Sequence, residues 1–193
     1  MFIETHLATH DEAVLHSLLR LNYIAAVSLV RIRDAEGDLL ILRKIRGLRR
    51  RLPFTIAYIE GNNRYVLNKY ITNDNIDVVT ILPGSEYPSR RQLSIIEDEG
   101  KYVELVALPF VRRGLIGDLS KVALDVMDYS TKAILTVGIE SINDVRNPID
   151  LVNLMAVLTG DKGYWIYLFY TFEASSRRPR VGICGRRCLL EEH

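Results

Sequence analysis

The second half of the chain alternates short apolar runs with amphipathic segments, and this alternation restricts the fold more than any other feature of the sequence. Residues 102–108 and 133–139 are short, apolar and rich in β-branched side chains, which is typical of buried strands. Residues 117–128 and 148–158 repeat apolar side chains every three or four positions, which predicts helices. An aromatic strand is expected at 164–172. This order of elements indicates βαβ crossovers and locally parallel strands.

The first half has a different pattern, in which apolar runs alternate with turn-forming residues and predict mostly antiparallel β-structure. A helix with Thr9 or Asp11 as its N-cap begins it, because the apolar residues that follow recur at helical spacing: Val14, Leu15, Leu18 and Leu19. We then expect three β-hairpins, which pair residues 23–33 with 39–42, 54–60 with 64–71, and 93–97 with 102–108. A further strand is expected at 76–82 and a loop at 85–91.

Together these patterns predict an α/β (α+β) fold, with a mixed, mostly antiparallel sheet, a locally parallel βαβ region and flanking helices. The 193 residues are enough for a single domain with a substantial core. Within it we distinguish a β-rich amino-terminal part (1–91), a core (92–173) and a basic tail (174–193).

Charge and hydropathy exclude some classes of function. The chain has 25 Lys and Arg against 24 Asp and Glu, so no global positive charge is available to drive binding to nucleic acid, and such binding would need a local patch. Apolar runs such as residues 23–30 are shorter than the ~20 residues that span a bilayer, and no secretory signal is recognised. We therefore expect a soluble cytoplasmic protein without a membrane partner.

Arginine dominates the cations, and amides are scarce. Only six of the 25 cations are lysines, and Gln92 is the only glutamine. Scarcity of thermolabile amides is one trend in heat-adapted proteins, although the cation enriched there is lysine. A thermophilic source is therefore a hypothesis that a melting temperature in the mesophilic range would remove.

The densest charge in the chain is a basic cluster between residues 43 and 51. Six of its nine residues are cationic: Arg43, Lys44, Arg46, Arg49, Arg50 and Arg51. Such a cluster can bind phosphate, nucleic acid or an acidic partner, or it can be a solvated surface balanced by acidic residues elsewhere. The basic tail adds further arginines, at Arg177, Arg178, Arg180, Arg186 and Arg187.

A third group of cations lies where a predicted strand meets a predicted helix. The strand at 102–108 is followed by a short basic turn with glycines, and a helix begins at Gly117. Free backbone N–H groups and the positive end of the helix dipole would meet at this turn, which favours an anion, above all a pyrophosphate. Arg112 and Arg113 would add charge for the same ligand.

The spacing of Pro109, Arg112, Ile116 and Gly117 resembles the Gcn5-related N-acetyltransferase family. In that family a loop of the form Pro-x-x-Arg-Gly-x-Gly-x-Gly/Ala holds the pyrophosphate of acetyl-CoA. The resemblance covers residues 93–172 and implies an acyl-CoA N-acyltransferase-like fold, with acetyl-CoA or another acyl-CoA as co-substrate and an amine as acceptor. It implies these cofactor-binding residues: Pro109, Arg112, Arg113, Gly114, Leu115, Ile116 and Gly117.

The sequence departs from the family at three positions. Arg113 and Leu115 stand where the family usually has glycines, and Leu115 could obstruct the approach of a phosphate. Ala156 stands where many members have a tyrosine that acts as general acid. Glu104 resembles the carboxylate that some members use as catalytic base, and its alternative interpretation is an exposed strand residue beside Lys101.

No metal site is expected. Cys184 and Cys188 are four residues apart with His193 behind them, but the tail does not supply four ligands. Two hypotheses result: an acyl-CoA-dependent N-acyltransferase, or a non-catalytic domain that binds nucleic acid or protein through its arginine clusters. Acetyl-CoA should raise the melting temperature under the first hypothesis, whereas salt-sensitive retention on nucleic acid would favour the second.

Overall fold

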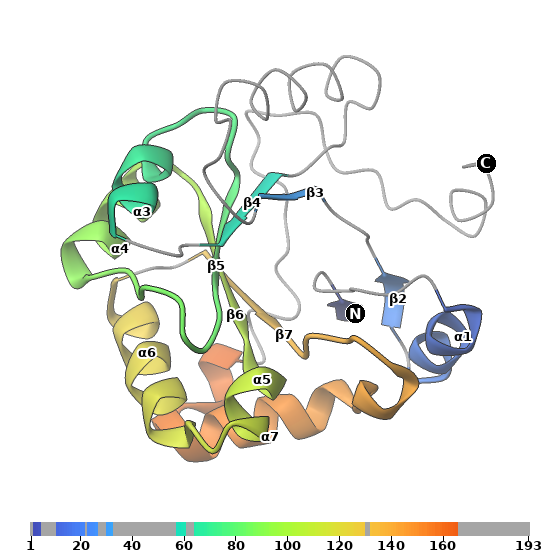
Figure 1. Ribbon diagram of the computed structural model, residues 1–193. Helices are drawn as coiled ribbons and strands as arrows, with labels where there is room; N and C mark the ends of the chain where they lie inside the picture. Colours follow the sequence, from blue (N-terminus) through green and yellow to red (C-terminus); the bar gives the residue numbers. More distant parts are fainter. Residues whose placement is uncertain are drawn as a thin grey trace.

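The computed structural model describes residues 2–4, 11–21, 23–26, 30–32, 57–60, 64–129 and 132–165. Its centre is a five-stranded sheet in which every neighbouring pair is parallel. The strands are β3 (Val30–Ile32), β4 (Ala57–Glu60), β5 (Val78–Ile81), β6 (Tyr102–Val106) and β7 (Ala133–Thr136). They lie side by side in the order in which they occur in the sequence (Figure 1).

Helices separate the strands from β4 onward. They are α3 (Arg64–Ile71), α4 (Arg90–Asp98), α5 (Ala107–Arg112), α6 (Ile116–Tyr129) and α7 (Pro148–Thr159), with the short 3-10 helix η1 (Ile142–Asp144) before α7. Figure 1 shows α3, α4 and α6 together on one side of the sheet, with α5 and α7 at its lower end. Sequential parallel strands with right-handed crossovers place their helices on the same face, which explains this arrangement.

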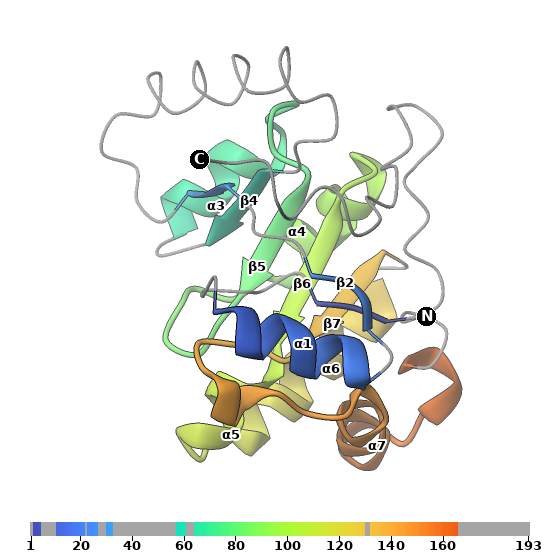
Figure 2. The ribbon, with the colours of Figure 1, turned by 90° about the vertical axis from the view of Figure 1, so that its right-hand side faces the viewer.

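The amino-terminal elements form a separate small unit of secondary structure. β1 (Phe2–Glu4) pairs in parallel with β2 (Tyr23–Ala26), and α1 (Glu12–Arg20) connects them. Figure 2 shows α1 in front of the sheet, beside the segment that contains η1. Residues of α1 and η1 contact each other, so the amino-terminal helix lies next to the loop that follows β7.

Helix boundaries follow from capping residues in the sequence. The Asp11 side chain accepts a hydrogen bond from Ala13 N at 2.9 Å, and the Asn147 side chain accepts one from Ile149 N at 3.0 Å. Ser89 and Gln92 form a capping box at the start of α4. Gly160 ends α7 in the left-handed conformation, with φ of 80°.

The two faces of the sheet are buried against different partners. Ile59, Val79 and Val103 form one register row and belong to the main apolar core, together with side chains of α4, α6 and α7. The neighbouring row, Tyr58 and Val78, belongs to a second, smaller apolar cluster. Because side chains alternate along a strand, the sheet separates these two clusters.

Several sequence-based predictions are confirmed. Asp11 is the N-cap of the first helix, the helices at 117–128 and 148–158 are α6 and α7, and the strands at 76–82 and 102–108 contain β5 and β6. The mixed α/β class is also correct. Residues 23–26 and 30–32 are strands β2 and β3, as expected for 23–33, but they pair in parallel with β1 and β4, and the expected partner at 39–42 lies outside the described residues. Most of the strand at 164–172 also lies outside them, and residues 162–165 are helical.

The mostly antiparallel first half is wrong. Residues 64–71 form helix α3 rather than a strand, and residues 93–97 lie within helix α4, so β4, β5 and β6 are joined by crossovers and pair in parallel. In α3 the buried residues are Leu67, Tyr70 and Ile71, which share one helix face at the three- and four-residue spacing. Burial of that face outweighs the aromatic and β-branched content that favoured a strand.

Candidate functional site

The loops at the carboxyl ends of β5, β6 and β7 meet at one edge of the sheet. In parallel α/β sheets this edge is where ligand-binding and catalytic residues usually gather, because the loops there converge from several strands. Residues 82–89 follow β5, α5 follows β6 directly, and residues 137–147 follow β7. This edge therefore defines the candidate site.

Gly138 allows the loop after β7 to lie directly against α5. Its φ is 85°, and a Cβ atom at this position would lie 2.4 Å from Val106 Cγ1 and 3.4 Å from Pro109 Cδ. Any side chain at this position would therefore clash with Val106, and the positive φ also favours glycine. Leu108 N then donates a hydrogen bond to Val137 O at 3.0 Å, which joins the start of α5 to this loop.

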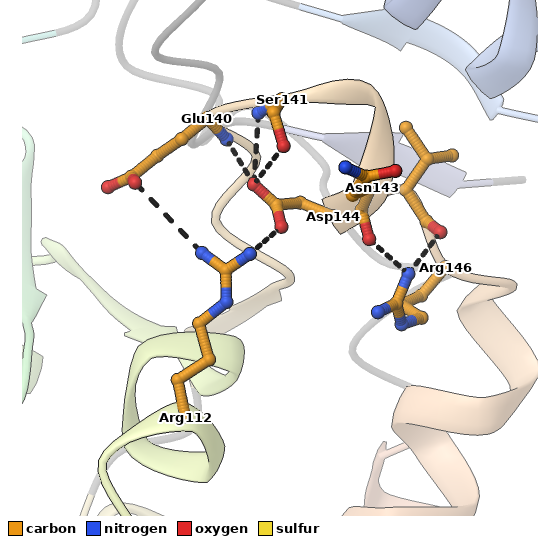
Figure 3. A network of polar contacts seen from close by, with 7 residues as sticks. Arg112, Glu140, Ser141, Asn143, Asp144 and Arg146 are labelled. Carbon is orange, nitrogen blue, oxygen red and sulfur yellow. Dashed lines mark hydrogen bonds and ion pairs between the residues drawn. The ribbon is translucent and has the colours of Figure 1, made fainter.

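A buried carboxylate fixes the shape of the loop between β7 and α7. Asp144 is fully buried, and its Oδ2 atom accepts hydrogen bonds from Glu140 N at 3.1 Å, Ser141 N at 2.9 Å and Ser141 Oγ at 3.2 Å. Its Oδ1 atom pairs with the Arg112 guanidinium (Figure 3). A buried charge needs such partners, so Asp144 holds η1 in place and ties it to α5.

Arg113, which follows α5, connects this helix to the loop after β5. Its Nη1 atom donates a hydrogen bond to Pro83 O at 2.9 Å, in the loop after β5. Tyr87 of the same loop lies with its ring centroid 6.0 Å from that of Phe110, and burial, with a contribution from the Asp118 charge, raises the pKa of Tyr87 above its usual value. Two adjacent arginines therefore link the three loops of the carboxyl edge.

A groove of about 320 Å³ lies beside this edge, between α1 and η1. It is lined by Ser17, Arg20, Leu21, Ile142 and Val145. Arg146, next to Val145, donates from Nη1 to Asn143 O at 2.6 Å and to Val145 O at 2.9 Å (Figure 3). The described lining of the groove thus combines three apolar side chains with the hydroxyl of Ser17 and the guanidinium group of Arg20.

The structure distributes the predicted cofactor-binding residues over two helices. Pro109 and Arg112 belong to α5, Ile116 and Gly117 belong to α6, and Arg113, Gly114 and Leu115 connect them. The expected direct passage from strand to glycine-containing turn is therefore wrong, because α5 intervenes. The role of these residues in binding acyl-CoA stays a prediction.

Glu104 lies inside the molecule rather than at the carboxyl edge. It is fully buried, and its Oε2 atom accepts a hydrogen bond from Thr80 Oγ1 on the neighbouring strand at 2.7 Å. The alternative interpretation of an exposed strand residue beside Lys101 is wrong, since Lys101 is itself buried and donates to Asn73 O at 2.6 Å. The role of Glu104 as a catalytic base stays a prediction.

Charge is divided unevenly between the described core and the remaining segments. Residues 33–56 and 166–193, which contain the basic cluster at 43–51 and the tail, lie outside the described residues and hold twelve Lys and Arg against six Asp and Glu. The rest of the chain holds thirteen Lys and Arg against eighteen Asp and Glu. The folded core therefore has an acidic excess that the near-zero net charge of the chain conceals.

The described residues contain no group of three or more His, Cys, Asp or Glu side chains that could hold a metal ion. None of the described helices has both the length and the apolar character that a bilayer crossing requires.

Sequence reasoning missed Asp144 and Gly138. Ser141 and Asp144 have the spacing of an N-cap residue and its N3 partner, which is a recognisable signal for a capped turn. Gly138 had no such signal, because its need for glycine arises from the distant residues Val106 and Pro109.

Comparison with known proteins gives a fold and no family. No protein-family model matches the chain, and no curated protein matches it. A chain in the cryo-EM structure of archaeal ribonuclease P with mature tRNA has a similar structure, with a TM-score of 0.63 and 13% sequence identity. The similarity covers 87% of this chain and 77% of that chain.

The comparison and the topology together correct the acetyltransferase resemblance. The solved chain of similar structure comes from archaeal ribonuclease P rather than from an acetyltransferase, and every neighbouring pair in the described five-stranded sheet is parallel. An acyl-CoA N-acyltransferase-like fold with a mostly antiparallel sheet is therefore not supported. Of the four residues that suggested that family, Pro109 and Arg112 belong to α5, and Ile116 and Gly117 belong to α6.

Proposed function

We propose that this protein is an RNA-binding protein that contacts RNA through the basic cluster at residues 43–51. The observation that carries the proposal is the similarity of its fold to a chain of archaeal ribonuclease P in a structure with mature tRNA. This proposed function corresponds to the second hypothesis from the sequence, a non-catalytic domain that binds nucleic acid or protein through its arginine clusters.

The distribution of charge supports the same function. An RNA surface repels an acidic core, and a protein binds it by placing Lys and Arg against phosphates and releasing counterions. The core of this chain has an excess of acidic residues, whereas residues 33–56 alone hold seven Lys and Arg against three Asp and Glu. The basic cluster is therefore the part of the chain best suited to the phosphate backbone.

The test compares two triple variants that remove the same charge. In one, Arg49, Arg50 and Arg51 are replaced by alanine, and in the other, the exposed core residues Arg64, Arg91 and Lys121 are replaced. Binding to a fluorescently labelled tRNA is measured by anisotropy over a range of salt concentrations.

We expect the cluster variant to lose affinity and the core variant to bind like the wild type. Loss of three phosphate contacts should make the negative slope of log K against log salt concentration shallower by about 2 to 3. If the wild-type protein does not bind RNA, the proposed function is wrong. If both variants bind with the same affinity and salt slope, the cluster is not the contact surface.

A further inference from the structure

The groove between α1 and η1 has the composition of a site for a flat, partly apolar anion. Leu21, Ile142 and Val145 supply apolar surface, and Ser17 and Arg20 supply a hydroxyl and a guanidinium group. None of the described residues that line it is acidic, although the described residues as a whole have an acidic excess. Ligand sites commonly combine an apolar wall with a few polar groups in this way, at volumes of roughly 300 Å³ and above.

Arg20 brings a guanidinium group to the groove for a phosphate. Arg20 lies in the last turn of α1 and is exposed, and the exposed His16 is one helical turn before it on the same face. Arg146 lies beside Val145 at the other wall, where its Nη1 atom is held by two backbone carbonyls. Among the described lining residues, Arg20 is therefore the one that brings a guanidinium group to a phosphate in the groove.

One wall of the groove is held rigidly. Ile142 and Val145 flank Asp144, whose carboxylate is bound by Arg112 and by three donors of its own loop (Figure 3). Val145 N also donates to Ile142 O at 3.3 Å. The apolar wall therefore exists before a ligand arrives, which reduces the entropy that binding costs.

We propose that this groove binds one unpaired nucleotide of an RNA, with its base against Ile142, Leu21 and Val145 and its phosphate on Arg20. The inference rests on the proposed RNA-binding function and specifies the kind of RNA. A base exposes its apolar faces only when it is unpaired, whereas an A-form duplex presents phosphates and 2′-hydroxyl groups. A groove of about 320 Å³ is too small to enclose an RNA helix, so a single nucleotide is the part of an RNA that it would take.

The first test uses two isoleucines that are equally exposed. Ile142 is 43% exposed and lines the groove, whereas Ile149 is 44% exposed on α7 and does not line it. Ile142→Glu places a negative charge where the base would lie, and Ile149→Glu adds the same charge elsewhere. The probes are a labelled single-stranded heptauridine and a blunt RNA duplex, with thermal unfolding as a check that both variants fold.

We expect Ile142→Glu to bind heptauridine at least about tenfold more weakly than Ile149→Glu, because its carboxylate would lie unpaired against the base and close to the phosphate on Arg20. Duplex binding should be the same for both variants within twofold. Arg20→Ala should likewise weaken heptauridine binding, with Arg64→Ala as the control for loss of an exposed helical arginine.

A second measurement locates the base directly. Heptauridine with 4-thiouridine at its centre is crosslinked to the wild-type protein, and we expect the crosslinked peptides to include residues 17–21 or 142–145. If the protein binds RNA but the two isoleucine variants are equal and the crosslinks lie elsewhere, the groove proposal is wrong and the proposed function stands. If no RNA binds at all, the proposed function itself is wrong.

Discussion

Both faces of the central sheet are buried, but the side chains that they bury differ in polarity. On the face toward α4 and α6 the strands present only apolar side chains, including Ile81, Leu105 and Leu135 in one register row. On the opposite face the corresponding row contains Glu60, Thr80 and Glu104, all of them buried. Strands that are buried on both faces of a parallel sheet usually consist of continuous apolar residues.

The two faces therefore contribute differently to the free energy of unfolding. An apolar side chain gains free energy from burial alone, whereas a buried polar group must recover through hydrogen bonds what it loses in hydration. The polar face therefore depends on particular pairs, such as the one between Thr80 and Glu104. Substitutions on the two faces should consequently change the free energy of unfolding by different amounts, and in one case with the opposite sign.

The largest effect is expected from Leu105→Ala on the apolar face. Leu105 is fully buried in the main core, so the variant loses the transfer free energy of its side chain and leaves a cavity. We expect the free energy of unfolding to fall by about 2–5 kcal/mol in urea denaturation. Leu124→Ala on α6 is the control, because Leu124 is 42% exposed, and a loss as large there would contradict the assignment.

A smaller loss is expected from Thr80→Val on the polar face. Valine keeps the volume of the side chain but removes the hydroxyl that donates to Glu104 Oε2 at 2.7 Å. The buried carboxylate then loses a partner, and we expect the free energy of unfolding to fall by about 1–3 kcal/mol. Thr80→Ser retains the hydroxyl and should recover most of the loss. If valine were as stable as threonine, the polar pair would contribute nothing.

Sequence reasoning located the elements whose periodicity extends over many residues. The helix at α6 spans fourteen residues and the helix at α7 spans twelve, which is long enough to show the helical repeat and, for α7, its Asn147 cap. β5 and β6 are short apolar runs between turn-forming residues and were equally visible.

The shorter helices were misassigned although the sequence contained a signal for one of them. The apolar residues of α4 that are buried, Leu93 and Ile96, lie only three positions apart, which is too few to establish a period. The Ser89 and Gln92 capping box marks the start of this helix and would have excluded a hairpin. One misassigned helix changes the direction of the next strand, so these errors converted a parallel sheet into an antiparallel one.

The candidate site depends on contacts that are distant in sequence. Arg112 and Arg113 were recognised as functional residues from their position after a strand, but their partners Asp144 and Pro83 lie about thirty residues away in either direction. Local patterns carry no information about such pairs. The groove could not be predicted for the same reason, because α1 and η1 meet only in the folded chain.

The smallest effect, with the opposite sign, is expected from Thr136→Val at the end of β7. Thr136 is 1% exposed, and its hydroxyl has no hydrogen-bond partner within the part of the chain that the structure describes. Burying such a hydroxyl costs free energy, so replacing it with a methyl group of similar size should leave the protein unchanged or stabilise it by up to about 1 kcal/mol.

The comparison with Thr80→Val makes this result informative. Both variants exchange a buried threonine for valine on the same face of the same sheet, on the two strands that flank β6, and they differ in whether the hydroxyl donates to a buried carboxylate. Urea denaturation of both under identical conditions therefore measures the hydrogen bond separately from the change in volume. A loss above about 1 kcal/mol in Thr136→Val would mean that the hydroxyl has a partner, because only a lost hydrogen bond produces a loss of that size without a cavity.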